Sequence, residues 1–294
     1  PSLPLLNKKS KTVWGPIGGG QTAPWAMRSY FGKMGWCREL LRTLRVRLSA
    51  WNPLCRKVVG DASLVMFANH ETEDLLWGAC RGDTCRMIDV GVNAEKFSVE
   101  NRSQTNTDNI NLLFAGKFEK RKGVSVVLDV FARAARQVPE LTCTFVGDGK
   151  DREKIMRLAK ESGLESRIEF TGDLSHDAMA GRFSEADIFL FSSLRDTTGA
   201  IVLEAMASGL PTVCFDHQGV RIMVDDDCGI RVDPGLGDEA IEKMAEAVVL
   251  LAEKPELRYE MGSCAKQRVL DHYTWERKCE SIDFWYKKLL NQTS

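Results

Sequence analysis

The sequence predicts an α/β fold in which parallel sheets carry helices on both faces. From residue 109 onward, short apolar runs alternate regularly with segments of helical period, as in right-handed strand–helix–strand units. The apolar runs are continuous, which is typical of strands that are buried on both faces. With 294 residues, of which 44% are hydrophobic and 28% charged, the chain can form two such units.

The first hundred residues are expected to form the smaller unit. Residues 11–25 have the pattern of a short strand that ends in a glycine-rich turn, and residues 61–72 that of a buried strand with a polar end. Residues 84–97 repeat this second pattern. Between these strands, residues 28–51 have helical period. One face of that helix carries four leucines, Leu40, Leu41, Leu44 and Leu48.

The second unit is expected to hold a longer series of strands and helices. Residues 100–109, which carry no periodicity and few apolar groups, precede it as a linker or surface loop. The expected strands are residues 109–116, 141–149, 167–173, 187–193 and 211–216. The expected helices are residues 123–139, 150–163, 176–186, one that begins near 199, and 240–252. A terminal helix over residues 274–290 carries aromatic residues on one face.

Composition and charge exclude several classes of protein. The formal net charge is −1, so no global positive field would recruit nucleic acid. Nine cysteines without a C-x-x-C pair indicate reduced thiols and a cytoplasmic location. No apolar run approaches the roughly 20 residues of a membrane helix. The four histidines are dispersed along the sequence, and no metal site is predicted.

The start of the helix at Gly199 is the first candidate for a binding site. Its first turn, formed by Gly199, Ala200 and Ile201, holds no acidic residue, whereas Asp196 lies just before it and Glu204 lies inside the helix. Unpaired amides and the helix dipole make such a start an anion site, for which phosphate is the usual ligand. Taken alone, however, the pattern is more often that of an ordinary helix with a threonine cap.

Further candidates follow other strands of the second unit. Lys117 and Lys122 flank a turn after its first strand, at the sheet edge where open α/β sheets bind ligands. Two cations that face a helix start would suit a diphosphate, although a solvated loop explains the lysines alone.

Three more turns at this edge contain candidate residues. Gly147 belongs to a tight turn that would let a nucleotide approach, and the incomplete G-x-G-x-x-G pattern there argues against an NAD(P) oxidoreductase. Gly172 and Asp173 fit a turn that holds a nucleobase through backbone groups, and fit a plain loop equally well. His217 follows another strand and would reach the sugar of a bound ligand, although an ordinary loop is the preferred interpretation.

Taken together and in this order, these stretches resemble the donor-binding lobe of the family 4 retaining glycosyltransferases, which have the GT-B fold. The similarity runs from Asn109 to about Asp271 and is carried by GKFEKRKG, VGDG, FTGD, DIFLFSS and DTTGAIVLEAMASGLPTV. The last stretch is similar to the family motif E-x7-E, with Asp196 in place of the first glutamate. The resemblance therefore implies a GT-B-like, Rossmann-type fold.

Two stretches outside this lobe also resemble the family. The first is WGPIGGGQTAPW, which is similar to a stretch late in the N-terminal lobe of some members and would form a cleft loop at Gly18, Gly19 and Gly20. The second is WERKCESIDFWYKKLL, which resembles the final helix that crosses back to that lobe.

The resemblance implies three segments and a truncated first lobe. Residues 1–105 would be a partial acceptor-side lobe and residues 106–273 the complete lobe that binds a nucleotide-sugar donor. Residues 274–294 would be the helix that crosses back. The chain opens with Pro1 and soon enters an apparent buried strand, which also suggests a fragment.

The resemblance also implies roles for individual residues. Lys117 and Lys122 would hold the donor diphosphate, and the amides at the Gly199 helix start would bind its distal phosphate. Glu204 would bind the ribose hydroxyls, and Asp196 would lie near the donor sugar. Asp196, Lys117 and Lys122 are thus the predicted catalytic residues. The short Asp196 side chain departs from the family pattern, as does Lys117, where many members have arginine.

The predicted function is retaining, metal-independent glycosyl transfer without a cofactor. The co-substrate would be a UDP-, GDP- or ADP-sugar, and the acceptor a hydroxyl of a saccharide or of a lipid-linked molecule. The lysines and the helix amides would stabilise charge on the departing diphosphate. The alternatives are a non-catalytic fragment that only binds a nucleotide sugar and a GT-B nucleotide-sugar epimerase.

The helix over residues 28–51 allows two interpretations. It carries Arg38, Arg42, Arg45 and Arg47 beside its leucines. Such a pattern is compatible with peripheral contact to anionic lipid, for instance at the inner face of a membrane. The interpretation we prefer from sequence is a helix buried between the two units, with its arginines on a solvated face.

Overall fold

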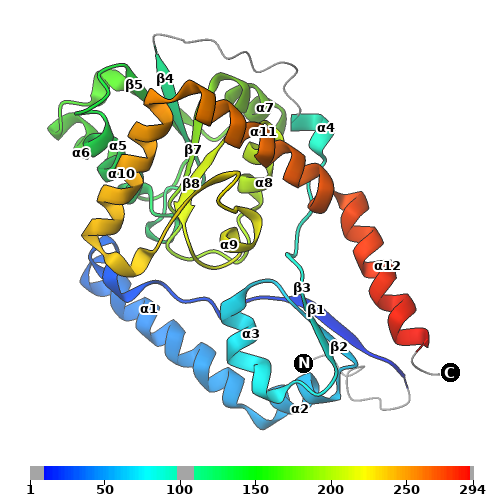
Figure 1. Cartoon of the computed structure of the whole chain (residues 1–294). Coiled ribbons are helices and arrows are strands. Elements are labelled where there is room, and N and C mark those ends of the chain that lie inside the picture. The colour runs from blue at the N-terminus through cyan, green and yellow to red at the C-terminus, as the bar shows by residue number, and fades with distance from the viewer. Residues whose placement is uncertain (1–9, 98–108, 292–294) are drawn as a thin grey trace.

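The computed structural model describes residues 10–97 and 109–291, which form two β-sheets with helices around them (Figure 1). The smaller sheet has the strand order β1-β2-β3, and the larger sheet has the order β6-β5-β4-β7-β8-β9. All of these neighbouring strands pair in parallel. The α/β class with parallel sheets that the sequence predicts is confirmed.

The smaller sheet is built from the first hundred residues. Its unit comprises β1 (Val13–Ile17), α1 (Arg28–Trp51), α2 (Pro53–Asp61), β2 (Leu64–Phe67), α3 (His70–Leu76) and β3 (Asp83–Arg86). The central strand β2 is fully buried because its side chains alternate between two covered faces. Val65 and Phe67 pack against residues of α1 and α2, whereas Leu64 and Met66 meet Leu289 from the far end of the chain.

The larger sheet alternates strands with helices along the chain. Its strands are β4 (Ile110–Ala115), β5 (Leu141–Val146), β6 (Ile168–Gly172), β7 (Ile188–Phe191), β8 (Thr212–Phe215) and β9 (Gly229–Val232). The helices between and after them are α5 (Val124–Ala134), α6 (Arg152–Glu161), α7 (His176–Glu185), α8 (Ala200–Ala207), α9 (Val220–Met223) and α10 (Asp238–Glu253). Three 3-10 turns complete the unit, η4 (Lys120–Lys122), η5 (Glu165–Arg167) and η6 (Pro234–Leu236).

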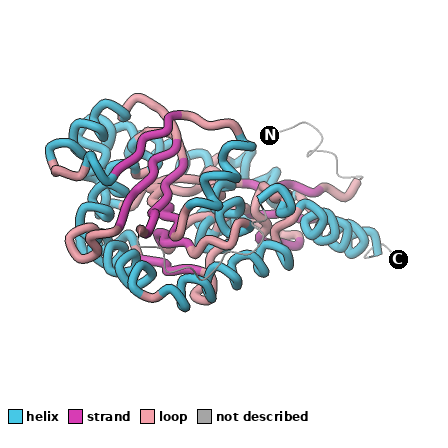
Figure 2. The backbone as a smooth tube through the Cα atoms, turned by 90° about the horizontal axis from the view of Figure 1, so that it is seen from above, coloured by secondary structure: helices cyan, strands magenta, loops and turns pink. Residues whose placement is uncertain are grey.

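Helices cover both faces of this sheet, as Figure 2 shows. Leu112 of β4 points into a core shared with α5 and α10, and its neighbour Leu113 points into a second core shared with α7 and α8. Both leucines are completely buried. Continuous apolar strands therefore mark two-sided burial in this chain.

Segments before residue 105 pack on the larger sheet as well. Met27 and Phe31, in and after the 3-10 turn η2 (Trp25–Met27), are buried in the core beside α5 and α10. Val92 and Phe97, the latter in α4 (Ala94–Phe97), are buried in the other core. Residues before 105 thus pack on both faces of the larger sheet. The expected boundary near residue 105 and nearly all of the expected linker over residues 100–109 lie outside the described residues.

The last helices lead the chain back toward the smaller sheet. Helix α11 (Pro255–His272) packs on α8, and α12 (Trp275–Asn291) runs beside the smaller sheet (Figure 1). Lys288 of α12 forms an ion pair of 2.9 Å with Asp83 of β3. Within residues 10–97 and 109–291, none of the helices combines the length and the apolar character that a membrane crossing requires.

Helix α1 contacts both units, but its leucines are not the buried face, so that part of the expectation is wrong. Its inner face is formed by other residues than its leucines, namely Phe31, Glu39 and Ala50. Arg42, expected on a solvated face, points inward and donates hydrogen bonds to the carbonyls of Gln21 (2.7 Å) and Gly19 (3.1 Å). The four leucines lie on the outer face and are between 42% and 60% exposed.

Candidate active site

The strand order of the larger sheet places a topological switch point between β4 and β7, and we call the region at the carboxyl ends of these two strands the crevice. The chain winds from β4 through β5 to β6 in one direction, and from β7 through β8 to β9 in the other. Open α/β sheets bind ligands beyond the carboxyl ends of the strands at such a switch point. Here these ends are followed by residues 116–123 after β4 and residues 192–199 after β7.

Two of the predicted catalytic residues meet in this crevice. The Lys122 ammonium forms an ion pair with a carboxylate oxygen of Asp196, and each side chain is only about 20% exposed. The other carboxylate oxygen of Asp196 accepts the amide proton of Thr197 at 3.0 Å. Lys117 lies exposed on the same loop as Lys122, and its side chain has no ion pair or hydrogen bond within the described residues. The structure therefore brings Lys122 and Asp196 together and leaves Lys117 unpaired at the rim.

The start of α8 is open to a ligand. No side chain caps it, because Thr198 donates its hydroxyl proton to Asp89 instead. In the described part of the chain, the amides of Gly199, Ala200 and Ile201 have no hydrogen-bond acceptor, and the first turn holds no acidic residue. The alternative of a threonine cap is thus wrong. Free amides, a positive helix end and a lysine that follows the neighbouring strand β4 are the groups that an anion site requires.

Gly199 is required at this position by the backbone and by its neighbour. Its φ of +81° lies in the left-handed region, which residues with a Cβ rarely adopt. A Cβ there would lie 2.7 Å from the ring of Phe191 at the end of β7. Both the backbone and the Phe191 ring therefore disfavour any residue with a side chain at this position.

Glu204 lies one turn further along α8 and is largely buried. Its Oε1 is 3.2 Å from Nε2 of His176, the first residue of α7. The His176 ring packs edge-on against Phe97 at a centroid distance of 5.0 Å. Burial raises the pKa of the Glu204 carboxyl, and the nearby imidazole opposes this shift. Sequence reasoning weighed His176 only as a metal ligand and missed this pairing.

This burial makes stability depend on pH through Glu204. A carboxyl whose pKa is raised in the folded chain stabilises the fold below its usual pKa of 4.5 and loses that contribution as pH rises through the folded pKa. We therefore expect Glu204→Gln to unfold at a higher temperature than the parent near pH 8, and the difference to shrink toward pH 4.5. Thermal unfolding across this range checks the prediction, and a variant that is less stable at pH 8 would contradict it.

The two glycine turns after β5 and β6 are joined to each other. The Gly147 amide donates to the Gly172 carbonyl at 2.9 Å. A Cβ on Gly147 would collide with the carbonyl oxygen of Gly116. Glycine is therefore required here by the neighbouring backbone of the chain, whether or not a nucleotide binds. Gly172 has a φ of +74°, and Asp173 is exposed without a contact in the described residues. Whether a nucleobase binds at these turns stays a prediction.

His217 is turned toward the backbone. Its Nε2 lies 2.9 Å from the carbonyl oxygen of Ser193, and its ring packs edge-on against Phe215. Burial lowers the pKa of the imidazole, which favours the neutral form. These contacts agree with the ordinary-loop interpretation of His217.

The glycine-rich loop after β1 lies directly against the loop that carries Asp196. A Cβ on Gly18 would collide with the Thr197 side chain, and one on Gly20 would lie 2.6 Å from the Cα of Thr72. Gly19 has open space around it, and its amide donates to the Gln21 side chain at 2.7 Å. The predicted cleft loop therefore touches the crevice from the side of the smaller sheet.

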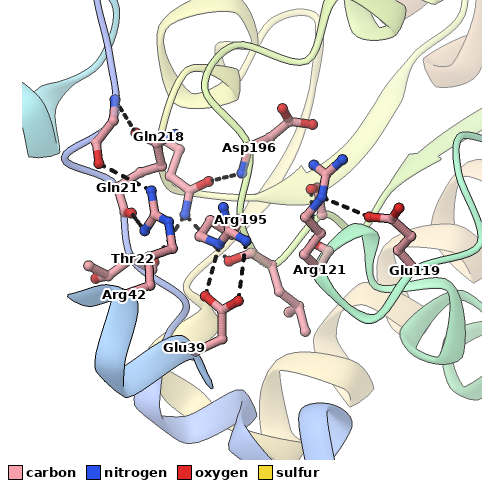
Figure 3. A network of polar contacts seen from close by, with 12 residues as sticks. Gln21, Thr22, Glu39, Arg42, Glu119, Arg121, Arg195, Asp196 and Gln218 are labelled. Atoms are coloured by element: carbon pink, nitrogen blue, oxygen red, sulfur yellow. Dashed lines mark hydrogen bonds and ion pairs between the residues drawn. The ribbon is translucent and has the colours of Figure 1, made fainter. Parts of the chain in front are cut away.

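A polar network joins the two units beneath this contact (Figure 3). Gln218, a buried residue with a φ of +56°, accepts the amide proton of Asp196 at 2.6 Å and donates to the carbonyl of Thr22 at 3.2 Å. Figure 3 shows the Asp196 carboxylate on the side away from Gln218. Gln21 donates to the Thr197 hydroxyl at 2.9 Å. The sequence analysis assigned no role to either glutamine, although Gln21 lies within the glycine-rich stretch and Gln218 follows His217.

Arg195 and Glu39 form a bidentate ion pair in this network. The guanidinium donates to both carboxylate oxygens, at 2.8 and 3.2 Å, and the side chains are 20% and 11% exposed. Because Glu39 belongs to α1 and Arg195 directly precedes Asp196, the pair links the smaller unit to the crevice.

Removing Glu39 is expected to destabilise the fold. Glu39→Ala would leave Arg195 without its carboxylate, and we expect a loss of about 1–2 kcal/mol after allowance for partial exposure. Asp283→Asn, in the exposed pair of Asp283 with Lys287, is the matched control and should cost less than about 0.5 kcal/mol. Urea unfolding of the two variants measures the difference, and equal effects would contradict this role.

The described residues contain no cluster of three or more His, Cys, Asp or Glu side chains that could hold a metal ion. The polar groups of the crevice are instead two carboxylates, two lysines and main-chain amides. Such a set suits a ligand that presents phosphate oxygens and hydroxyl groups.

Comparison with known proteins gives three kinds of match. Residues 96–268 match the family model described as Glycosyl transferases group 1. The chain is 28% identical over 248 residues to the sulfoquinovosyl transferase SQD2 of Arabidopsis thaliana, which covers 78% of this chain and 46% of that protein. It is 30% identical over 155 residues to the alpha-D-kanosaminyltransferase of Streptomyces kanamyceticus. This match covers 52% of this chain and 39% of that protein. The chain thus spans less than half the length of these relatives.

Solved structures agree with the fold. Sucrose-phosphate synthase from Thermosynechococcus elongatus superposes with a TM-score of 0.69 at 22% identity, covering 90% of this chain and 66% of that one. HepE from Anabaena, solved in complex with UDP and glucose, superposes with a TM-score of 0.60 at 18% identity. The match covers 81% of this chain and 67% of that one. The GT-B-like architecture of parallel sheets flanked by helices that the sequence predicts is confirmed.

Proposed function

The chain belongs to the Glycosyl transferases group 1 family, and on this basis we propose that it transfers a sugar from a nucleotide-diphosphate sugar to an acceptor hydroxyl. We further propose retention of the anomeric configuration, as in the family 4 enzymes whose motif Asp196 and Glu204 resemble. The acceptor would be a saccharide or a lipid-linked molecule, and the reaction would need neither metal nor cofactor. The nine cysteines, all of them free thiols, support a cytoplasmic site of action.

The open start of α8 at the switch point carries this proposal. Three free amides and the helix dipole converge there with Lys122, and Lys117 stands at the rim. A diphosphate needs several donors of this kind in one place, because its oxygens carry adjacent negative charges. The absence of an acidic residue from the first turn of α8 supports the same ligand.

The ion pair of Lys122 with Asp196 suggests how the site responds to a donor. In the free chain, Asp196 neutralises the Lys122 ammonium. A diphosphate at the α8 amides would attract the Lys122 ammonium. The released Asp196 carboxylate would then accept a hydrogen bond from a hydroxyl of the donor sugar. As the bond between sugar and phosphate breaks, charge grows on the leaving diphosphate, where the lysines and the amides stabilise it.

Glu204 supports a contact to the ribose. Its carboxylate follows the phosphate site by about one turn of α8, and a carboxylate accepts hydrogen bonds from two adjacent hydroxyls. We expect Glu204→Gln to weaken nucleoside diphosphate binding about tenfold, because a charged acceptor becomes neutral. Calorimetric titration with the nucleotide measures the effect. Glu185→Gln, an exposed residue of α7, is the control and should leave the affinity unchanged.

The proposal is tested first by thermal unfolding in the presence of UDP, GDP and ADP. A ligand that binds only the folded chain raises its stability in proportion to the logarithm of concentration over Kd, so the preferred base gives the largest shift. Transfer or hydrolysis of the matching nucleotide sugar, followed by mass spectrometry, then tests the activity. Binding without either reaction would identify a binding fragment, and an altered donor without acceptor would identify an epimerase. No shift with any nucleotide would overturn the proposal.

A further inference from the structure

The outer face of α1 and α2 is apolar and positively charged. Seven large apolar side chains on these two helices are between 42% and 78% exposed, Met34, Leu40, Leu41, Leu44, Leu48, Trp51 and Leu54. Single exposed apolar residues are ordinary, but a continuous patch of them marks a surface that contacts something else. We refer to these seven residues as the α1 patch. Figure 1 shows both helices at the periphery of the molecule.

The exposed charges on these helices are positive, and Asp61 at the end of α2 is half-buried. Residues 26–60 contain seven exposed cations, Arg28, Lys33, Arg38, Arg45, Arg47, Arg56 and Lys57. The only acidic residue in this range is Glu39, which is buried and paired with Arg195. The whole chain has a net charge of −1, so this face is a local positive region on a nearly neutral protein.

The cations are interleaved with the apolar residues. Arg45 lies one helical turn from both Leu41 and Leu48, and Arg47 lies one turn from Leu44 and from Trp51 in the same way. Arginine side chains have long apolar stems, so they can direct their guanidinium groups to charged headgroups while neighbouring leucines enter the acyl boundary. A water-soluble protein partner would have to supply apolar surface and several acidic groups in the same spacing.

From this surface we infer that α1 and α2 lie on an anionic lipid bilayer, with the α1 patch in the headgroup boundary. The positive region complements the negative surface of the bilayer, and the leucines and Trp51 bury apolar area there. This inference does not depend on the proposed activity, because it uses no residue of the crevice. It gives the peripheral lipid contact a defined surface on the protein.

The inner face of α1 explains why this attachment would be rigid. Glu39 and Arg42 tie the helix to Arg195 and to the glycine-rich loop, so their side chains face away from the α1 patch. The docked helix would therefore carry the crevice with it at a fixed orientation to the bilayer.

Vesicle sedimentation tests the inference with the whole 294-residue chain. We expect the chain to bind vesicles of phosphatidylcholine with phosphatidylglycerol, and to bind pure phosphatidylcholine vesicles at least about tenfold more weakly. The triple variant Leu41→Gln, Leu44→Gln and Leu48→Gln should lose at least about tenfold in binding to the anionic vesicles. The double variant Arg45→Gln and Arg47→Gln should bind the anionic vesicles about fivefold more weakly for each arginine removed.

The controls replace equally exposed residues elsewhere on the molecule. Leu270→Gln with Phe284→Gln, on α11 and α12, should leave vesicle binding unchanged. All substituted side chains are exposed, and the thermal unfolding midpoint of each variant verifies that it is folded. Two results would overturn the inference. One is equal binding by the parent and the leucine variant, and the other is a leucine-dependent dimer in light scattering without vesicle binding.

Discussion

Replacing Lys122 by alanine is expected to lower the affinity for a nucleoside diphosphate about 10- to 100-fold. A hydrogen bond to a charged group contributes about 1.5–3 kcal/mol, and the largely buried Lys122 ammonium is paired with Asp196, just before the start of α8. The loss also leaves the Asp196 carboxylate unpaired beside the phosphate site, where it repels the ligand. Calorimetric titration with the preferred nucleotide measures the change.

Asp196→Asn separates this explanation from simple misfolding. The substitution removes the negative partner and frees Lys122, so nucleoside diphosphate should bind as tightly as in the parent or more tightly, while sugar transfer falls. Lys154→Ala, an exposed lysine on α6, is the control for the loss of one positive charge. Unchanged affinity in a folded Lys122→Ala variant would exclude Lys122 from the phosphate site.

Gly199→Ala is expected to destabilise the fold by about 2–5 kcal/mol and to abolish measurable nucleotide binding. The backbone at this residue is left-handed, which costs about 1–2 kcal/mol for a residue with a Cβ. The added Cβ also meets the Phe191 ring at 2.7 Å, and overpacking of this kind costs about 1–3 kcal/mol. Relief of the contact would move the α8 amides out of the crevice.

Gly163→Ala is the matched control for this prediction. Gly163 has a φ of +68° at the end of α6, close to that of Gly199, but a Cβ there would meet nothing within 4 Å. It should therefore show only the backbone cost of about 1–2 kcal/mol. Urea unfolding of both variants gives the comparison. If the two cost the same, the contact with Phe191 has no role at Gly199.

The regular part of the fold could be predicted because its signal is local. Strands such as β2 and β7 are buried on both faces, so their sequences are continuously apolar. Helix α11 has no such signal and was not predicted. Its buried positions are Arg258, Gly262, Ala265 and Val269, and a Cβ on Gly262 would collide with the Gly209 carbonyl. Packing through close backbone approach leaves no apolar stripe for a pattern search to find.

The exposure of α1 could not be predicted either. A row of leucines at helical spacing usually marks the buried face, and the sequence does not reveal which face a neighbour covers. In this chain the inner face uses Phe31, Glu39 and Ala50, and a buried carboxylate such as Glu39 depends on a partner 156 residues away. The leucine row therefore predicted the helix correctly and its orientation wrongly.

The candidate site was predictable where it follows strand ends, and not where it depends on distant contacts. Parallel strands place Lys122 and Asp196 at one sheet edge, and the structure pairs them. The roles of Gln218 and Gln21 arise from the packing of the smaller unit on the larger one. The pairing of His176 with Glu204 likewise depends on how α7 packs beside α8, which no spacing in the sequence encodes.

The polar contacts around Asp196 have a consequence for building chimeras from related enzymes. The four-residue stretch from Arg195 to Thr198 is held on both flanks by side chains of the smaller unit, Glu39, Gln21, Asn69 and Asp89. A chimera that replaces the larger unit by that of a relative would keep these four side chains from the original smaller unit. Transferring the relative's residues at these four positions together with its larger unit should therefore decide whether the chimera is active.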